Sequence, residues 1–265
     1  MIALLKQIPS EAKIRTELRR LCFGANLHCP RCHSRRVYRS ETRYRCRRCR
    51  RPFTLLTGTW LEGAKIALRT VWGVLWCYTQ QVPVRQTQKL CHLNEQTVRH
   101  WFRTFRLHIP MVEPILEGTV QLDEAYFKNT ALMLAKQVGT SNLAYTVFAK
   151  RVLDKRDAAR FLFQSVAPRS RLQTDGAGIY RGIDRWWPVA HRTDIHRKWE
   201  FALTSEIEGA FGNLRTFIRR MYHHVRPEQL PEYVTEFCAR FCSPETFDSP
   251  RTFLQKTLCT VPTAT

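Results

Sequence analysis

The sequence predicts a mixed α/β domain that follows a small metal-binding module and a helical region. Four observations support this prediction. Two Cys-x-x-Cys pairs lie near the N-terminus, and strand-like and helix-like segments alternate between residues 117 and 242. Apolar residues make up 44% of the chain, which is ordinary for a folded protein. At 265 residues the chain has room for two or three compact units.

The chain is strongly basic, with 43 Lys and Arg against 22 Asp and Glu and a net charge of +21. Because the basic residues run through the whole chain, we expect an extended polyanion as partner, a nucleic acid before a membrane surface. No segment approaches the roughly 20 apolar residues of a spanning helix, and the N-terminus lacks a signal-peptide pattern. We therefore expect a cytoplasmic protein with no membrane association.

We predict one or two short helices in residues 1–28 and a zinc ribbon in residues 29–57. Each Cys-x-x-Cys pair presents two thiolates on one tight turn, so two pairs complete a tetrahedral zinc site with no open position. Such a site is structural, and paired cysteines in a basic chain indicate a reducing compartment. The alternative is four ordinary buried or free cysteines. The predicted zinc ligands are Cys29, Cys32, Cys46 and Cys49.

Residues 58–116 are predicted to be helical, with a helix-turn-helix at about 84–106. Asn94 is a predicted N-cap of the second helix, in which Val98 and Trp101 face the partner helix. The basic side chains of this helix are then placed along DNA. An amphipathic helical hairpin with a solvated basic face remains the alternative. The predicted DNA-contacting residues are Arg99, His100, Arg103 and Arg106.

Residues 117–242 form the predicted α/β domain. Its strands are expected at 119–127, 143–149 and 171–174, and its helices at 155–166, 205–220 and 227–241. The tail, residues 243–265, is rich in Thr and Pro, and we expect it to be peripheral.

Three acids in this domain are candidates for metal chemistry. Asp123 and Asp175 end apolar strands, where a carboxylate is costly unless it is paired or holds a cation, and Glu208 lies beside the apolar stripe of a helix. Acids from two strands and a helix can converge on a pair of Mg²⁺ or Mn²⁺ ions. A purely structural role is the alternative. Glu124 points to the opposite face from Asp123, so we assign it a supporting role.

Several motifs between residues 20 and 242 follow one order: Cys29-Pro-Arg-Cys32, Cys46-Arg-Arg-Cys49, Arg51-Pro-Phe53, Thr57-Gly-Thr59, Leu122-Asp-Glu-Ala-Tyr126, Thr174-Asp-Gly-Ala-Gly-Ile-Tyr180 and Ile207-Glu-Gly-Ala-Phe-Gly-Asn-Leu-Arg215. With these motifs the chain resembles the zinc-ribbon transposases of bacterial insertion sequences, in the family numbered fifteen ninety-five. The stretch from Lys128 to Asn142 departs from the family, because it lacks the Gly-rich, Lys-containing linker often found after the first acid.

The resemblance implies a ribonuclease H-like domain and the DDE transposition reaction, with Asp123, Asp175 and Glu208 as its three acids and Mg²⁺ or Mn²⁺ as cofactor. Such enzymes nick the ends of their element to free 3′-hydroxyls, which attack target DNA with no covalent protein–DNA intermediate. The implied partners are double-stranded DNA, both terminal inverted repeats and target, and further copies of the chain in a homo-oligomer on DNA. The implied location is the bacterial nucleoid.

Two further basic residues, Arg215 and Arg219, lie on the same helical face as Glu208 and are candidates for phosphate contact. A solvated basic face is the alternative. His191 lies between the second and third acids, as a substrate contact or a structural residue. Two other functions remain open: a non-enzymatic DNA-binding regulator built on the ribbon and helix-turn-helix, and a nuclease that hydrolyses DNA without joining it.

Overall fold

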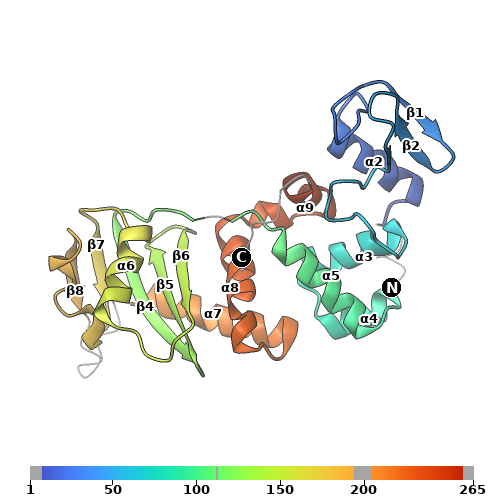
Figure 1. Cartoon of the computed structure of the whole chain (residues 1–265). Helices are drawn as coiled ribbons and strands as arrows, with labels where there is room; N and C mark the ends of the chain where they lie inside the picture. The colour runs from blue at the N-terminus through green and yellow to red at the C-terminus, as the bar shows by residue number, and fades with distance from the viewer. Residues whose placement is uncertain (1–7, 112, 194–203, 259–265) are drawn as a thin grey trace. The chain divides into compact units, whose positions relative to one another are not determined.

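The protein is described by a computed structural model that covers residues 8–111, 113–193 and 204–258. The chain divides into two compact units, and Figure 1 labels most of their helices and strands. One unit comprises Met1–Pro110 and Glu245–Thr265, and the other comprises Met111–Pro244. Among the described residues, no helix has both the length and the apolar composition needed to cross a lipid bilayer.

The first unit begins with a helix and a small antiparallel sheet. Helix α2 (Glu11–Phe23) starts at Ser10, whose hydroxyl accepts a hydrogen bond from the Lys13 amide. The sheet has the order β1-β2-β3 and packs against Phe23 at the end of α2. Its strands are β1 (Val37–Ser40), β2 (Arg43–Cys46) and β3 (Pro52–Phe53).

Three helices follow: α3 (Leu68–Thr79), α4 (Val84–Cys91) and α5 (Glu95–Leu107). Helices α4 and α5 have the arrangement that the sequence predicts for a helix-turn-helix. His92 takes a left-handed backbone conformation in the turn, and Asn94 Oδ1 accepts a hydrogen bond of 2.7 Å from the Thr97 amide. Val98 and Trp101 are buried where α5 packs on α3 and α4, as expected.

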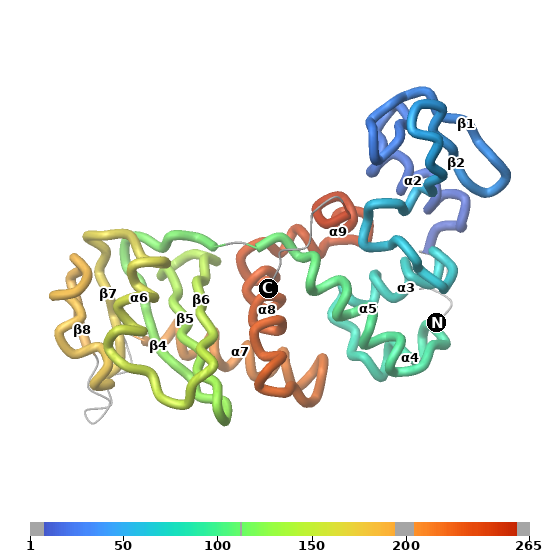
Figure 2. The backbone as a smooth tube through the Cα atoms, in the orientation of Figure 1, coloured from blue at the N-terminus to red at the C-terminus, as the bar shows by residue number. Residues whose placement is uncertain are grey.

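The end of the chain differs from the sequence prediction, because residues 243–258 are not a peripheral tail. Helix α9 (Pro250–Thr257) packs against α3 within the first unit, as the chain trace in Figure 2 shows. Phe253 of α9 is fully buried. The Thr- and Pro-rich composition concealed a helix start, in which the Ser249 hydroxyl caps α9 and Pro250 occupies the first turn.

The second unit is a mixed α/β domain, which confirms the predicted fold class. Its five-stranded sheet has the order β6-β5-β4-β7-β8, in which β4, β5 and β6 pair antiparallel and β7 and β8 add parallel. This order agrees with the ribonuclease H-like fold that the resemblance implies. The strands are β4 (Thr119–Phe127), β5 (Thr130–Gln137), β6 (Leu143–Phe148), β7 (Arg171–Thr174) and β8 (Ala190–Thr193).

Helices cover both faces of this sheet. On one face, α6 (Lys155–Ser165) shares an apolar core with Val120 and Leu122 of β4. On the other face lie α7 (Ser205–Tyr222) against β4 and β5, and α8 (Leu230–Cys242) against β6. Single turns of 3-10 helix complete the described elements: η1 (Gly178–Tyr180), η2 (Ile183–Arg185), η4 (Pro227–Gln229) and η5 (Pro244–Phe247).

Strand β5 was not predicted from the sequence. It lies between β4 and β6 and is covered on both faces, so Thr130–Lys136 is buried throughout and shows no polar alternation. The chain reverses after β4 in a short turn in which Lys128 has a φ of 54°. The stretch from Lys128 to Asn142 therefore holds a buried strand rather than a long loop after the first acid.

Candidate active site and zinc centre

Asp123 and Asp175 lie at the point where two parallel strands stop pairing. The last paired residues of β4 and β7 are Leu122 and Thr174, and each aspartate is the next residue of its chain segment. Because parallel neighbours present their carboxyl ends at one edge, the two acids come together. Strand β4 itself continues to Phe127 in its pairing with β5. Asp123 is therefore inside a strand, not at its end as the sequence analysis had it.

Glu124 joins these aspartates. One carboxylate oxygen from each of Asp123, Glu124 and Asp175 lies within 4.8 Å of the other two. The Tyr180 hydroxyl donates a hydrogen bond to Glu124 Oε2. Burial raises the pKa of the Glu124 carboxyl to about 7 against the effect of this hydrogen bond, and the charges of Asp175 and Asp123 act in the same direction as burial. The supporting residue of the sequence analysis thus lies in the acid cluster itself.

The residues around Asp175 are held by local hydrogen bonds. Asp175 Oδ1 accepts a bond of 3.0 Å from the Ala177 amide, and the Thr174 hydroxyl donates to the Asp175 carbonyl at 2.8 Å. His191 Nε2 lies 2.8 Å from the same Thr174 hydroxyl, and burial lowers the pKa of this imidazole. Of the two roles considered for His191, these contacts favour the structural one.

Glu208 lies in the first turn of α7, and its side chain is exposed. Its Oε1 accepts a hydrogen bond of 3.2 Å from the Thr204 hydroxyl. The turn rests on the Asp123 face of the sheet, because Gln121 of β4 accepts hydrogen bonds from α7 amides. Within the described part of the chain, Glu208 is not among the acids whose oxygens lie within 4.8 Å of one another.

The acid cluster fits a catalytic divalent metal. Mg²⁺ and Mn²⁺ prefer oxygen ligands, and three carboxylates at this spacing offer several. Asp123, Glu124 and Asp175 are each partly exposed, so substrate oxygens and water can reach the same place. When bound, such ions polarise the oxygen atoms they hold and lower the pKa of a bound water.

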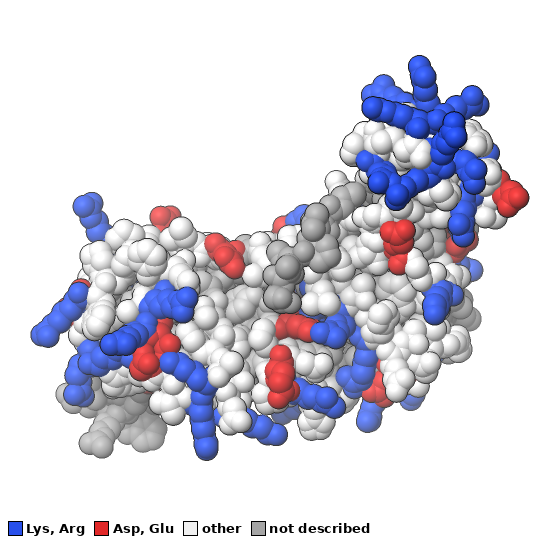
Figure 3. Space-filling model, viewed as in Figure 1, with Lys and Arg blue, Asp and Glu red and all other residues white. Residues whose placement is uncertain are grey.

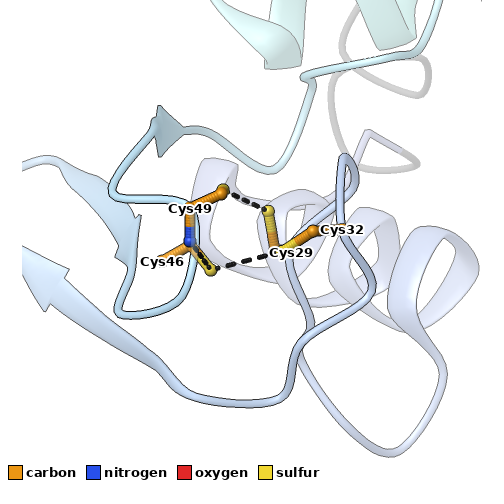
Figure 4. A group of neighbouring side chains, drawn as sticks. All are labelled: Cys29, Cys32, Cys46 and Cys49. Atoms are coloured by element: carbon orange, nitrogen blue, oxygen red, sulfur yellow. Dashed lines mark hydrogen bonds between the residues drawn. The ribbon is translucent and has the colours of Figure 1, made fainter.

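The four predicted zinc ligands converge in the ribbon (Figure 4). The Sγ atoms of Cys29 and Cys49 are 3.6 Å apart, and those of Cys32 and Cys46 are also 3.6 Å apart. Around a tetrahedral zinc with Zn–S bonds of about 2.3 Å, neighbouring sulfurs lie ~3.8 Å apart. All four are free thiols rather than disulfides. The cluster therefore fits a structural zinc ion with a closed shell.

Backbone amides prepare one of these ligands. The amides of Cys49 and Arg48 donate hydrogen bonds to Cys46 Sγ at 3.5 and 3.3 Å. These bonds, led by that of Cys49, lower the pKa of the Cys46 thiol to about 6. A thiolate is the form that binds zinc, so these bonds favour the metal-binding form of Cys46 at neutral pH, whereas burial raises the pKa of the neighbouring Cys49 thiol to about 12.

The residues predicted to contact DNA on α5 divide into two groups. Arg99, His100 and Arg103 are exposed, and Arg99 pairs with Glu95 at 2.7 Å. Arg106, in contrast, is only 4% exposed, because it falls on the buried stripe that begins at Val98 and returns every three or four residues. We therefore remove Arg106 from the proposed DNA contacts. On α7 both predicted arginines, Arg215 and Arg219, are exposed.

Sequence reasoning missed a pair of glutamines beside the acids. Gln121 and Gln173 are direct partners in the β4–β7 register, and each stands two residues before an aspartate. The signal was present in the sequence as two copies of Gln-x-Asp, at Gln121–Asp123 and Gln173–Asp175. A polar residue at an inward position of an apolar strand calls for a partner.

Two protein-family models match the chain. The transposase zinc-ribbon domain matches residues 9–52, and the ISXO2-like transposase domain matches residues 115–241. The first match contains the four zinc-site cysteines, and the second contains the acid cluster and α7. Fold, site and matches together define a DDE-type transposase. The chain belongs to the zinc-ribbon transposases of insertion sequences, the IS1595 family.

One protein with a related sequence matches about half of the chain. Over 130 residues the chain is 29% identical to an uncharacterized protein in transposable element ISH50 of Halobacterium salinarum, which covers 47% of this chain and 44% of that protein. The chain thus spans less than half of that relative.

Among solved structures, the catalytic core domain of BIV integrase is 12% identical, with 46% of this chain and 82% of that chain covered and a TM-score of 0.35. A chain of the simian T-cell lymphotropic virus intasome is also 12% identical, with 63% and 67% covered and a TM-score of 0.35. Likenesses this weak carry no weight in the assignment.

Proposed function

We propose that this transposase binds double-stranded DNA at the ends of its insertion sequence and catalyses metal-dependent strand cleavage and strand transfer there. The observation that carries the proposal is the juxtaposition of Asp123 and Asp175 beside the first turn of α7. Asp123 and Asp175 hold the divalent ions in this proposal, and Glu208 supplies the third carboxylate.

The chemistry requires two metal ions held about 3.5–4 Å apart, which together stabilise the attacking and leaving oxygens of an in-line phosphodiester exchange. A carboxylate oxygen of Asp123, one of Asp175 and one of Glu124 lie within 4.8 Å of one another. Glu208 lies outside this group, so the proposal requires its exposed side chain to turn from the Thr204 hydroxyl toward the aspartates. Oxygen ligands are thereby supplied from both strands and from the helix.

The DNA-binding part of the proposal rests on exposed positive charge. The ribbon between Cys29 and Phe53 contains ten arginines and one acid, Glu41, and Figure 3 shows the basic side chains crowded over it. All ten are exposed, and none forms an ion pair within the described chain. They are Arg31, Arg35, Arg36, Arg39, Arg43, Arg45, Arg47, Arg48, Arg50 and Arg51. Uncompensated guanidinium groups of this density suit a phosphate backbone.

One face of the β1–β2 hairpin concentrates this charge. Tyr38 pairs with Arg45 across the hairpin, and Arg47 lies over the Tyr38 ring at 5.4 Å. The opposite face packs Tyr44 on Phe53 in the ribbon core. Proteins that bind single strands use several aromatic rings, on which successive bases stack. This face has several arginines and a single aromatic ring, so it fits contact with the backbone of a duplex better than binding of a single strand.

We include Arg99, His100 and Arg103 of α5 and Arg215 and Arg219 of α7 among the proposed DNA contacts. The α5 residues follow the Asn94 cap of the second helix of the helix-turn-helix, where base-edge contacts are usual. The α7 residues follow Glu208 on the same helical face, where phosphate oxygens near the acids are expected.

The decisive experiment uses the full chain, Mg²⁺ or Mn²⁺, and duplex DNA that carries the terminal sequences flanking its gene. We expect the wild type to nick these ends and join them to a target duplex. Asp175→Asn is expected to lose both reactions by on the order of 10³-fold or more, as loss of one member of a catalytic unit does. Its affinity for the same DNA is expected to stay within about twofold, because most of that affinity comes from phosphate contacts elsewhere.

Three outcomes would contradict the proposal in different ways. Unchanged strand transfer by Asp175→Asn would remove this residue from the active site. Cut products without joined products would indicate a nuclease that only hydrolyses. Specific DNA binding with no metal-dependent reaction in the wild type would indicate a regulator.

A further inference from the structure

A buried amide joins the three elements that carry the proposed acids. Gln121 Nε2 donates a hydrogen bond of 3.4 Å to Gln173 Oε1 across the β4–β7 pair. Gln121 Oε1 accepts hydrogen bonds of 2.9 Å from the amides of both Glu206 and Ile207 in the first turn of α7. This one side chain of β4 therefore contacts both β7 and α7.

These contacts share one spacing relative to the acids. Gln121 stands two residues before Asp123, Gln173 two residues before Asp175, and Glu206 two residues before Glu208. Side chains two residues apart in a strand share a face of the sheet, so the amide pair and Asp123 lie on the α7 side. The Gln121 amide thus contacts a residue two positions before Asp175 and one two positions before Glu208, and itself stands two positions before Asp123.

The surroundings show why Gln121 is needed there. The first amides of a helix have no partner within the helix, and the N-cap of α7, Thr204, makes no side-chain cap. Gln121 supplies that cap from a neighbouring strand. Its side chain is 3% exposed, so water does not replace it readily.

A second contact holds the same turn and makes a test practicable. Lys136 of β5, the register partner of Gln121, forms an ion pair of 2.9 Å with Glu206. The Lys136 side chain is 7% exposed, and its ammonium also donates to the Gln137 and Thr140 carbonyls. We therefore expect helix α7 to stay attached to the sheet when Gln121 is replaced, with only its first turn held less tightly.

We propose that Gln121 is a positioning residue for the metal site: it fixes the first turn of α7, and with it Glu208, relative to Asp123 and Asp175. The inference rests on the proposed function, because it takes these three acids as the ligands. Residues behind metal ligands typically affect metal affinity or activity 10–100-fold.

The test compares Gln121→Leu with Tyr222→Phe in the full chain. Gln121→Leu keeps side-chain bulk but removes all three hydrogen bonds. Tyr222→Phe is the matched control, because it removes a hydrogen bond of 2.6 Å to Glu236 from the far end of the same helix. Three quantities are measured: hydrogen exchange at the Glu206 and Ile207 amides without added metal, Mn²⁺ affinity by titration calorimetry, and the rate of DNA cleavage.

For Gln121→Leu we expect faster exchange at both amides and Mn²⁺ binding weakened by about tenfold or more. Tyr222→Phe is expected to keep Mn²⁺ affinity within about twofold even where its melting temperature falls equally. Gln121→Glu retains an oxygen acceptor for the two α7 amides, and a rotated Gln173 amide can donate to it. This variant is therefore expected to recover the protection of both amides.

Two results would overturn the inference: wild-type Mn²⁺ affinity in Gln121→Leu, or an equal loss of affinity in Tyr222→Phe. Faster exchange in Gln121→Leu with unchanged Mn²⁺ affinity would also overturn it, because Gln121 would then cap α7 without positioning the metal site. A wild-type chain that neither binds Mn²⁺ at the acids nor cleaves DNA counts against the proposed function instead. The two failures are thus distinguishable.

Discussion

Tyr180 donates a hydrogen bond to Glu124, and this contact connects the buried core on the α6 side of the sheet to the acid cluster. Tyr180 is 1% exposed, whereas Glu124 is half-buried and its oxygen lies within 4.8 Å of Asp123 and Asp175. Glu124 therefore differs from Asp123 and Asp175, because its carboxylate accepts a hydrogen bond from a buried tyrosine. Burial raises the pKa of the Glu124 carboxyl to about 7, so near neutral pH this carboxyl is about half protonated.

The first prediction concerns stability and pH without added Mg²⁺ or Mn²⁺. The pKa of Glu124 is about 7 in the folded chain and 4.5 ordinarily, so the folded state holds the proton more tightly. Its stabilising contribution is complete below about pH 4.5 and is lost as pH rises to about 7. Glu124→Gln, which stays neutral, is expected to match the wild-type melting temperature at pH 4 and exceed it at pH 8. An identical pH dependence in both proteins, measured by calorimetry, would contradict this.

The second prediction separates Glu124 from Glu208 as the third acid. The geometry groups Glu124 with the aspartates, whereas the family-like block around residue 208 selects Glu208. We expect Glu208→Gln to lose strand transfer as severely as Asp175→Asn, on the order of 10³-fold. Glu124→Gln is expected to lose about tenfold or less, as a residue behind the ligands does. Single-turnover assays on the terminal DNA measure both, and the reverse ranking would make Glu124 the third acid.

The third prediction concerns zinc. We expect about one tightly held zinc per chain, because four thiols complete the tetrahedral shell. The double change Cys46→Ser and Cys49→Ser is expected to release it and unfold the ribbon, whose apolar core is small. Cys91→Ser, outside the ribbon, is the control and is expected to retain the metal. Elemental analysis of the purified proteins measures zinc, and a zinc-free wild type with a folded ribbon would contradict the assignment.

The fourth prediction concerns the arginine face of the ribbon. Replacing Arg43, Arg45 and Arg47 together by Gln is expected to weaken binding to any duplex and to lower the slope of log affinity against log salt by about one per lost phosphate contact. The charge-matched control replaces three exposed arginines of the second unit, Arg151, Arg156 and Arg160. Fluorescence anisotropy at several salt concentrations measures the slopes. Equal slopes for the two triple variants would remove the ribbon from the DNA interface.

Much of the site could be predicted from the sequence because its elements are locally encoded. The two Cys-x-x-Cys turns carry their own geometry, and strand β4 was predicted with the bounds observed, Thr119–Phe127. Strand β5 was missed because a fully buried central strand has no alternation to recognise. Gln121 was missed for another reason: its partners are 52 residues away in Gln173 and 85 residues away in Glu206, so the Gln-x-Asp motif marks the residue but does not reveal what it pairs with.

The last prediction concerns helix α9, which composition alone placed outside the fold. Phe253 is fully buried, and its ring lies 5.8 Å from that of Tyr78 on α3 and 6.1 Å from that of Phe105 on α5. Removing such a ring leaves a cavity, so Phe253→Ala is expected to destabilise the first unit by about 3–5 kcal/mol. Because α5 loses packing with it, DNA affinity is expected to fall as well.

Phe163→Ala is the matched control, because Phe163 lies on α6 and is 70% exposed. It is expected to change stability by less than about 0.5 kcal/mol, as most surface changes do. Thermal unfolding followed by calorimetry measures both variants, and the zinc content of Phe253→Ala shows whether the ribbon survives. If Phe253→Ala and Phe163→Ala melt at the same temperature, α9 does not belong to the core of the first unit. If α9 does belong there, truncating the chain after Ser243 must destabilise the helix-turn-helix even though the cut lies 136 residues beyond the end of α5 at Leu107.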